Sequence, residues 1–518
     1  MKRLFPIMCT LLLLYCPFGF AAIVWDGTSK APWTKGSGTE SDPYLIETPA
    51  NLAYLAEQVQ NGQTYEKTYF MQTNDIDLNN KGCQVGSSSS RCFWGIYNGG
   101  QKQIINVSGC LFGYIKSATI KNLTIAGTST YPMINNVNGN VFLVNCHNKS
   151  TSKIRQGGAG LVNVAEQGCI TLENCSNSAI IESSGFMIMH NNDYNQIITD
   201  TVCLGGLVAK AQNIKMSNCH NAGDIKFVRP GYNNYWSAGN GCAAGLVGYA
   251  NILTITQSFN NGEINFDGSG KRDYSGSGVS KVYVAGLALG KGSILQSYNI
   301  GNIYGGSNFN VSGSGYRAPE YAYGLSDCTN SYCYSKGITI VNRGYRYCLG
   351  GVCTNCYCIL SKQIENVADN TSVDIYYNSD MPVTNPYNAV AKTKEQMKSP
   401  SFVSLLNTDG DYFYPDYTHI NDGYPILRWQ LEGTTMYKIR ATCPSAQGVV
   451  SGSGEYPATA NITLKATPKD GYTFTGWSDG NTDNPRTITV NGNATYVAQF
   501  SQAAYTIYVN QDCTTDIE

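Results

Sequence analysis

Short runs of alternating apolar and polar residues, separated by turns, recur through the middle of this chain. In one copy, residues 244–249, 253–259 and 263–266 each have the pattern of a short strand, and Asn260-Asn261-Gly262 has the composition of a turn. Three short strands per copy predict one coil of a β-helix. Each such coil leaves its backbone edges open, and the next coil pairs with them at about 4.8 Å.

Two motifs mark the successive copies, a Gly-Leu or Gly-Val pair and a polar tetrad. The pairs begin at Gly160, Gly206, Gly245, Gly286, Gly324 and Gly351. The tetrads begin at Asn145, Asn174, Asn218, Gln257, Gln296, Asn330 and Asn355. Their starts are 29, 44, 39, 39, 34 and 25 residues apart, which fits a constant core with insertions of varying length. The sequence therefore predicts an all-β fold, a β-helix or β-solenoid of about seven coils.

Equivalent residues of stacked coils form columns. The pattern predicts a column of leucines in the narrow core and an amide ladder made of Asn177, Asn221, Asn260 and Asn299. It also predicts an aromatic stripe made of Phe259, Tyr298, Tyr332 and Tyr357. If the stripe points outward, it is a candidate surface for stacking on sugar rings or for protein contact. An inward or edge-covering ladder is the alternative of equal weight.

The 19 cysteines allow three interpretations. Two of them, Cys9 and Cys16, lie in the predicted signal peptide, which leaves an odd number in the exported chain. Cys175 and Cys219 share one predicted column, and Cys333 and Cys358 share another, so each pair is a candidate disulfide between coils. A column of buried thiols is the alternative. Zinc is the competing hypothesis for Cys353, Cys356 and Cys358, although no histidine lies near them in the sequence.

The segments around the predicted solenoid favour small helical caps. Thr48 and Pro49 open a helix whose apolar face includes Leu52, Leu55 and Val59, and Gly62 ends it. Further on, residues 393–396 form a capping box, and a second short helix is expected from Ser399-Pro400 to Leu406. Residues 436–501 then alternate as a separate small β module, in which Trp477 is expected to be core rather than a platform for sugars.

The predicted domains follow from these elements: a signal peptide at 1–21, a leader and cap at 22–108, solenoid repeats at 109–360, a C-terminal cap at 361–430 and the β module at 436–501. Residues 502–518 are expected to be either the start of a truncated second module or a strand that packs on the first module. Lys2 and Arg3 precede a short apolar run, and small residues stand at the expected cleavage site near Ala21. We therefore expect a secreted, extracellular or cell-surface protein. The apolar run of the signal peptide is too short to span a membrane, and no later segment is apolar enough.

Charge narrows the classes of partner. Lys plus Arg number 35 and Asp plus Glu number 36, and only 14% of residues are charged. Such a balance favours neither nucleic-acid binding nor electrostatic membrane binding. An extracellular glycan or surface protein is the expected partner, and no cofactor is expected. Besides the aromatic stripe, the candidate contacts are the insertions at 181–202 and 227–241, the latter with Tyr232, Tyr235 and Trp236.

The motifs resemble those of a known group of exported bacterial proteins. The Gly-Leu-Val-Gly stretch at 245–248, followed by Gln257-Ser-Phe-Asn-Asn-Gly262, is similar to the GLUG repeat. Residues 25–28, 38–46 and 74–78 resemble the leader that precedes such repeats in Bacteroidales. Residues 466–477 resemble the divergent B-repeat of internalin-type proteins. The resemblance implies an adhesin-like surface protein without catalytic residues. The copies at 286–289 and 324–327 depart from the motif because they lack its second glycine.

A β-helix can also be a polysaccharide lyase or glycoside hydrolase, and these need clustered acids. Asp224 and Glu263 share one repeat position, but Asn302 takes that position in a later coil, which is typical of a turn residue. His147 and His220 share a column with serine and aromatic residues. We therefore expect a non-enzymatic binding protein. A structural spacer and a carbohydrate-active enzyme are the alternatives.

Overall fold

The computed structural model describes residues 22–183, 202–228, 241–267, 282–305 and 320–503, the last range with short gaps between 337 and 388. The chain divides into two compact units, Met1–Ala391 and Lys392–Glu518. Most described residues lie in or between short strands, and helices are few. The predicted signal peptide, the insertions that carry Tyr232, Tyr235 and Trp236, and nearly all of residues 502–518 lie outside the described residues.

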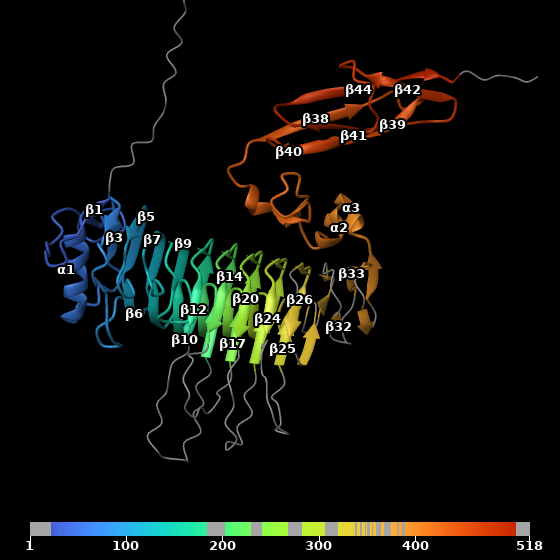
Figure 1. Ribbon diagram of the computed structural model, residues 1–518. Coiled ribbons are helices and arrows are strands. Elements are labelled where there is room, and N and C mark those ends of the chain that lie inside the picture. Colours follow the sequence, from blue (N-terminus) through green and yellow to red (C-terminus); the bar gives the residue numbers. More distant parts are fainter. Residues whose placement is uncertain are drawn as a thin grey trace, which may run out of the picture. The chain divides into compact units, whose positions relative to one another are not determined.

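The first unit is built from coils whose strands pair in parallel with the same strands of neighbouring coils (Figure 1). One coil comprises β17 (Gly241–Ala244), β18 (Val247–Thr256), β19 (Phe259–Asn260) and β20 (Ile264–Asp267). β18 pairs in parallel with β14 (Val208–Ser217) on one side and, with two register shifts, with β22 (Ala288–Leu295) on the other. This parallel stacking agrees with the predicted solenoid.

Each coil contains four strands, whereas the sequence predicted three. The expected strand 244–249 is broken at the Gly245-Leu246 bend, and Gln257 adopts a positive φ of 47° that separates β18 from β19. Asn174, Asn218 and Gln296 have the same left-handed conformation at the equivalent corner of their coils. The first residue of the polar tetrad therefore turns the chain between two strands.

The long strands of the coils form one ladder, and the short strands after the corner form another. The long ladder also contains β5 (Ile96–Ile105), β7 (Thr119–Gly127), β9 (Val141–Ser150), β10 (Val162–Glu173), β26 (Thr329–Ser331) and β30 (Cys353–Thr354). The short ladder runs from β9 through β11 (Ser176–Asn177), β15 (His220–Asn221), β19, β23 (Tyr298–Asn299), β27 (Tyr334–Ser335) and β31 (Tyr357–Cys358) to β33 (Tyr376–Asn378). The first coils add β1 (Ile23–Val24), β2 (Tyr44–Ile46), β3 (Tyr69–Gln72), β4 (Ile76–Asp77), β6 (Phe112–Lys116) and β8 (Ile134–Asn138) to the same large sheet, which also includes β35 (Val390–Lys392).

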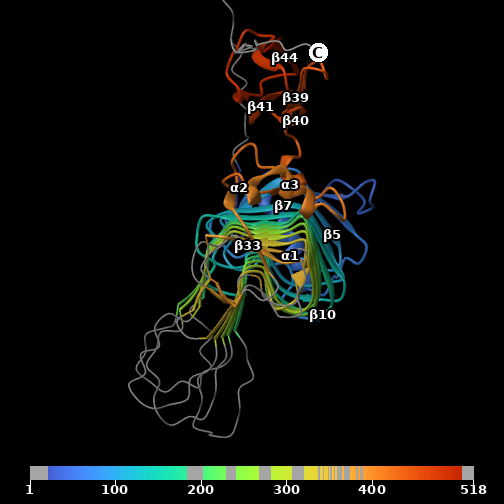
Figure 2. The ribbon, with the colours of Figure 1, turned by 90° about the vertical axis from the view of Figure 1, so that its right-hand side faces the viewer.

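Two further parallel sheets leave this body and pack on each other as an arm, which Figure 2 shows from the end of the solenoid. One sheet contains β12 (Ile181–Ser183), β16 (Ile225–Val228), β20, β24 (Ile303–Gly305) and β28 (Thr339–Val341). The other contains β13 (Val202–Gly205), β17, β21 (Val282–Ala285), β25 (Glu320–Tyr323), β29 (Gly344–Tyr347), β32 (Ile364–Asn366) and β34 (Val383–Asn385). The arm has its own core, in which Leu204, Ile225, Ile264 and Val284 are buried.

The repeated leucines fill the core of the body, as predicted. Leu161, Leu207, Leu246, Leu287 and Leu325 are fully buried in one cluster. Leu349 takes the next place, because the Leu325 amide donates to its carbonyl. The glycine before each leucine is required by packing. A Cβ on Gly245 would lie 2.1 Å from the Gly286 carbonyl oxygen and 2.4 Å from Cγ of Asn260.

The predicted amide ladder is present beside these glycines. The side-chain amides of Asn177, Asn221 and Asn260 donate along the axis to Oδ1 of the next asparagine, ending at Asn299, at 2.8–2.9 Å. Each amide also donates to the carbonyl two residues ahead, for example from Asn260 to Gly262 at 2.8 Å. All four side chains are fully buried. Paired in this way, their polar groups do not carry the cost of an unsatisfied buried amide.

Helix α1 (Pro49–Gln60) lies at the N-terminal end of the solenoid (Figure 1). Thr48 is its N-cap, and the predicted apolar face is confirmed, since Leu52, Leu55 and Val59 are buried in the same core as the first coils. An open coil end would leave apolar side chains exposed to water. The helix covers them.

The second unit begins before the small β module and corrects a predicted boundary. It contains α2 (Lys394–Lys398), α3 (Pro400–Leu406), β36 (Phe413–Tyr414), β37 (Ile426–Leu427) and the 3₁₀ helix η1 (Arg428–Leu431). The sequence assigned these elements to the solenoid cap at 361–430. The structure groups them with the module because the Tyr417 ring packs on Tyr456 at 4.9 Å and the Tyr414 hydroxyl donates to the Glu455 carbonyl.

The module itself contains two sheets. One has the order β40 (Gly454–Pro457), β38 (Met436–Thr442), β44 (Ala494–Gln502), β42 (Tyr472–Trp477), and the other has the order β39 (Gly448–Ser451), β41 (Asn461–Pro468), β43 (Arg486–Thr489). Its core includes Ile439, Leu464 and Trp477, which is 1% exposed. Trp477 is therefore a core residue, as predicted.

Candidate functional site

The predicted aromatic stripe is a buried column and not an exposed surface. The rings of Phe259 and Tyr298 stack at 4.9 Å and 6°, and those of Tyr298 and Tyr334 at 4.8 Å and 7°. Phe259 is 5%, Tyr298 1% and Tyr334 0% exposed. His220 extends the stack, with its ring 4.9 Å from that of Phe259. These rings cannot receive a sugar without unfolding of the coil.

Tyr332 does not belong to this column. The register pairs Tyr298 with Tyr334, and Tyr334 with Tyr357, of which only the backbone is described. Tyr332 lies two residues earlier, at the corner, with the positive φ of Gln296 in the previous coil. The prediction was wrong because the tetrad of this copy was aligned on Asn330, whereas the residue at the corner is Tyr332, two positions later.

Neither predicted disulfide pair is present, and for Cys333 and Cys358 the reason is the same shift. Cys175 and Cys219 share a column, as predicted, but both carry free thiols, and so does Cys333. Cys358 is disulfide-bonded, but it stands opposite Ser335 in register and not opposite Cys333. The alternative of a buried thiol column therefore holds for Cys175 and Cys219.

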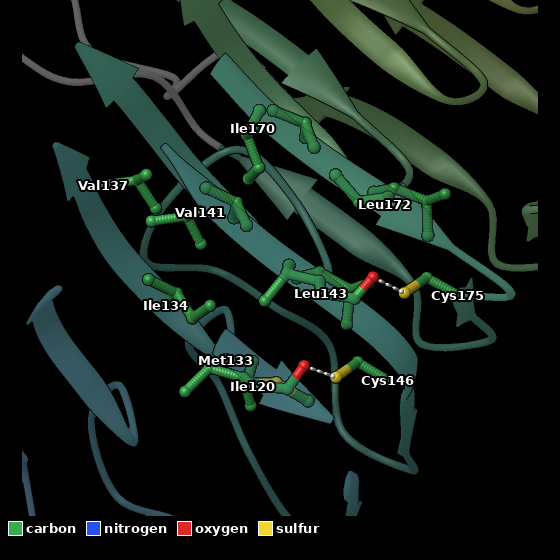
Figure 3. Close-up of a cluster of buried hydrophobic side chains, with 14 of the residues drawn as sticks. Ile120, Met133, Ile134, Val137, Val141, Leu143, Cys146, Ile170, Leu172 and Cys175 are labelled. Carbon is green, nitrogen blue, oxygen red and sulfur yellow. Dashed lines mark hydrogen bonds between the residues drawn. The ribbon is translucent and has the colours of Figure 1, made fainter. Parts of the chain in front are cut away.

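Hydrogen bonds explain why a small thiol or hydroxyl occupies this column. The Sγ of Cys175 donates to the Leu143 carbonyl at 3.4 Å, and the Sγ of Cys146 donates to that of Ile120 at 3.3 Å (Figure 3). In later coils the hydroxyls of Ser258 and Ser297 donate to the carbonyl two residues before them, at 2.8 and 2.7 Å. Cysteine and serine thus have the same role here. For the zinc hypothesis, the described residues contain no group of three or more potential ligands that could hold a metal ion.

His147 and Ser176 give the arrangement most similar to a catalytic pair. Nδ1 of His147 lies 2.8 Å from Oγ of Ser176, and His220 follows Ser176 in the same column. Burial lowers the pKa of His147, and it lowers the pKa of His220 to about 4. Both rings are therefore neutral at neutral pH, and a neutral ring can accept a proton. However, Ser176 is 8% exposed, and no carboxylate is among the groups that shift the pKa of either ring. A base without an orienting acid and a nearly buried nucleophile do not make an activated nucleophile.

A different surface lies where the arm meets the body, and we name it the corner surface. It consists of partly exposed Cys203, Tyr249, Tyr283 and Tyr323 around the buried residues Cys242, Ala244, Ala285 and Leu289. Outward side chains of β17 and β21 thus contact outward side chains of β18 and β22. The bend at each Gly-Leu pair is therefore concave on this side.

The corner surface has small residues at its vertex, which is the line where the arm bends away from the body, and larger residues on either side of that line. Gly205, Ala244 and Ala285 follow one another in register on the arm. Lys210 stands beside Tyr249 on the body and is exposed. Asp327 is exposed as well, accepts a hydrogen bond from the Gly290 amide at 2.9 Å, and has its pKa raised by partial burial. Tyrosine rings between an ammonium and a carboxyl group offer both apolar contact and hydrogen bonds.

The repeat pattern of the sequence does not reveal the corner surface. Its tyrosines occur once per coil at different positions of the repeat, so no periodic pattern reveals them. The register does show one signal, since Cys203, Cys242 and Tyr283 occupy one column on the face opposite to the buried Leu204 column. That column becomes visible only once the bend at Gly206 is known.

Comparisons with known proteins identify the C-terminal module. Residues 437–504 match the family model described as a divergent InlB B-repeat domain. No curated protein matches the chain. Two solved structures align with the chain at 15% identity. One is a candidate immunoglobulin A1 protease from Bacteroides ovatus, with a TM-score of 0.30 over 77% of this chain and 95% of the other. The second is an IgA1 protease, with a TM-score of 0.29 over 67% of this chain and 21% of the other. TM-scores this low carry no argument about fold or activity. The family match, together with the two-sheet module observed there, makes residues 437–504 a divergent InlB B-repeat domain.

Proposed function

We propose that this chain is an exported, non-catalytic binding protein that recognises an extracellular glycan or surface protein. Export near Ala21 and the assignment of the solenoid to GLUG-type repeat proteins are parts of the same proposal. The B-repeat domain supports it, because this family resembles modules of internalin-type surface proteins. In the part of the chain that the structure describes, no helix has the length and apolarity needed to cross a membrane.

The corner surface is the observation that carries the proposal. Tyr249, Tyr283 and Tyr323 are partly exposed on successive coils, so an elongated ligand would meet a ring at each step along the axis. Such rings bind flat apolar faces of sugars or side chains, while Lys210 and Asp327 provide a cation and a carboxyl group at the flanks. The buried column of Phe259 and Tyr298 offers no such contact.

The test is binding of purified residues 22–518 to an array of glycans, mucins and matrix proteins. We expect a saturable signal that falls at least tenfold in the Tyr249→Ala, Tyr283→Ala double variant, equivalent to about 1.4 kcal/mol. Phe142→Ala is the matched control, since it removes an aromatic ring that is 47% exposed on β9, away from the corner surface. An equal loss with Phe142→Ala, or no loss with the double variant, would place the contact elsewhere. Absence of binding by folded protein would instead favour a structural spacer.

The non-catalytic part of the proposal has a separate test at Ser176. A fluorophosphonate probe labels serine residues that a general base activates. We expect no labelling of the folded wild-type chain, because Ser176 is nearly buried and its histidine partner has no orienting acid. Labelling that disappears in Ser176→Ala would show that His147 and Ser176 form a working pair and would overturn this part.

A further inference from the structure

Two cysteines of the corner surface face each other on adjacent coils. Cys203 of β13 and Cys242 of β17 are direct partners in the parallel register. Both carry thiols, and Cys203 is partly exposed while Cys242 is 6% exposed. Neighbouring parallel strands lie about 4.8 Å apart, and in-register side chains point to the same side of the sheet. A Cα separation of that size falls within the range of about 4.4–6.8 Å that disulfides adopt.

The local environment favours reaction at this pair over the thiols of the body. The hydrogen bond with Cys242 and, more weakly, the Lys210 ammonium lower the pKa of Cys203. Hydrogen bonds lower the pKa of Cys175 as well, so access to the sulfur is what distinguishes the two sites. Cys175 and Cys219, by contrast, are fully buried, and their Sγ atoms donate to backbone carbonyls. A disulfide there would sacrifice these hydrogen bonds, and an incoming oxidant could not reach either sulfur. Small neighbours at the vertex, such as Ala244, leave room for the two corner sulfurs to turn toward each other.

We propose that Cys203 and Cys242 form a disulfide that joins two adjacent coils at the corner surface. The Cys203 thiolate attacks a sulfur of an external disulfide, such as oxidised glutathione, and releases one thiolate of that reagent. The Cys242 thiolate then attacks Sγ of Cys203 and releases the second thiolate. The protein loses two protons and two electrons, and the reagent disulfide is reduced to two thiols. The cross-link closes a long loop between the coils, so it stabilises the folded chain.

The proposal is tested by treating the folded, reduced chain 22–518 with oxidised glutathione and mapping its disulfides by mass spectrometry without reduction. Cleavage after aromatic and basic residues separates Cys203 from the other cysteines near it, since Tyr194 lies between it and Cys175, and Lys210 lies between it and Cys219. We expect a cross-linked peptide pair that contains Cys203 and Cys242, in addition to the disulfide of Cys358, and a thermal unfolding midpoint above that of the reduced protein.

Variants assign the two roles. Cys242→Ser should retain glutathione on Cys203 as a stable mixed disulfide, because the resolving thiol is missing. Cys203→Ser should take up glutathione at neither position and should lose the rise in unfolding midpoint. The Cys175→Ser, Cys219→Ser double variant is the matched control and should form the cross-link as the wild type does. Two results would overturn the proposal, provided that the circular dichroism of the protein remains native. One is full alkylation of both corner thiols after oxidation, and the other is pairing of Cys203 with another cysteine.

Discussion

At the scale of single residues, the inner column shows how one position accepts cysteine and serine but few other residues. The Cys175 amide donates to Sγ of Cys219 at 3.4 Å, and the Cys219 amide donates to Oγ of Ser258 at 3.1 Å. Each side chain in turn donates to the carbonyl two residues before it. The side chain thus accepts from one coil and donates within its own, which valine or alanine cannot do.

Substitutions at Cys219 test this role. Cys219→Ser should change the free energy of unfolding by less than about 1 kcal/mol, because serine already makes the same bonds at position 258. Cys219→Val puts an apolar group at this position and leaves the buried Cys175 amide without its acceptor, so it should cost about 1–3 kcal/mol. Urea denaturation of both variants under reducing conditions measures the difference. Equal stability of the two would mean that the column is held by packing alone.

The stacked histidine predicts a pH dependence. Burial lowers the pKa of His220 to about 4, whereas a histidine of the unfolded chain titrates near about 6.5. Between these values the unfolded chain binds the proton and the folded chain does not. The contribution of neutral His220 to the free energy of unfolding is therefore complete above about pH 6.5. It declines as the pH falls toward 4, by at most about 3 kcal/mol.

His220→Phe removes this titration while keeping the stack, since Phe259 fills the same position in the next coil. We expect the variant to lose less stability than the wild type between pH 6.5 and 4, as measured by chemical denaturation at several pH values. His147, which is also shifted downward by burial, remains in both proteins and provides the common background. Parallel stability profiles for the two proteins would contradict the predicted proton linkage.

At the scale of the strand and its corners, the sequence predicted the positions that recur at a constant spacing in every coil. It did not predict the positions that move within a shortened coil. The asparagines of the ladder and the leucines of the core keep a constant separation from their strands, so their columns could be found by alignment of the repeats. Tyr332 was misplaced because the copy around it is shortened. The direction of the aromatic column could not be predicted either. In a two-residue strand such as β19 both Phe259 and Asn260 are buried. The alternation of apolar and polar residues therefore does not show which side chain points into the core.

The coupling between the glycine corner and the asparagine ladder predicts a severe effect at Gly245. In Gly245→Ala the new methyl group would meet the Gly286 carbonyl of the next coil and the Asn260 side chain. Since a backbone atom cannot move without disturbing the register, we expect a loss of about 3 kcal/mol or more in the free energy of unfolding. Gly492→Ala is the control, because no heavy atom lies within 4 Å of its added Cβ. A loss of the same size in both variants would assign the effect to glycine replacement in general.

At the scale of the whole molecule, the chain has separate hydrophobic cores. The sequence predicted the main elements of each core, but not which core the elements between them join. The solenoid and the β module were both expected, but the helices α2 and α3 were assigned to the former and belong to the compact unit of the latter. Capping boxes and apolar spacing identify a helix. They do not tell which core its apolar side chains will join, since that depends on contacts such as Tyr417 on Tyr456.

Separate cores predict separate unfolding. Trp477 is 1% exposed in the core of the second unit, and Tyr298 is 1% exposed in the solenoid. Trp477→Ala should destabilise only the second unit, by about 3–5 kcal/mol, and Tyr298→Ala only the first. Calorimetry of the full chain should therefore show two transitions, each lowered by one variant and unchanged by the other. If both variants instead lowered a single common transition, the two units would fold as one cooperative body, and the solenoid would depend on its B-repeat domain for stability.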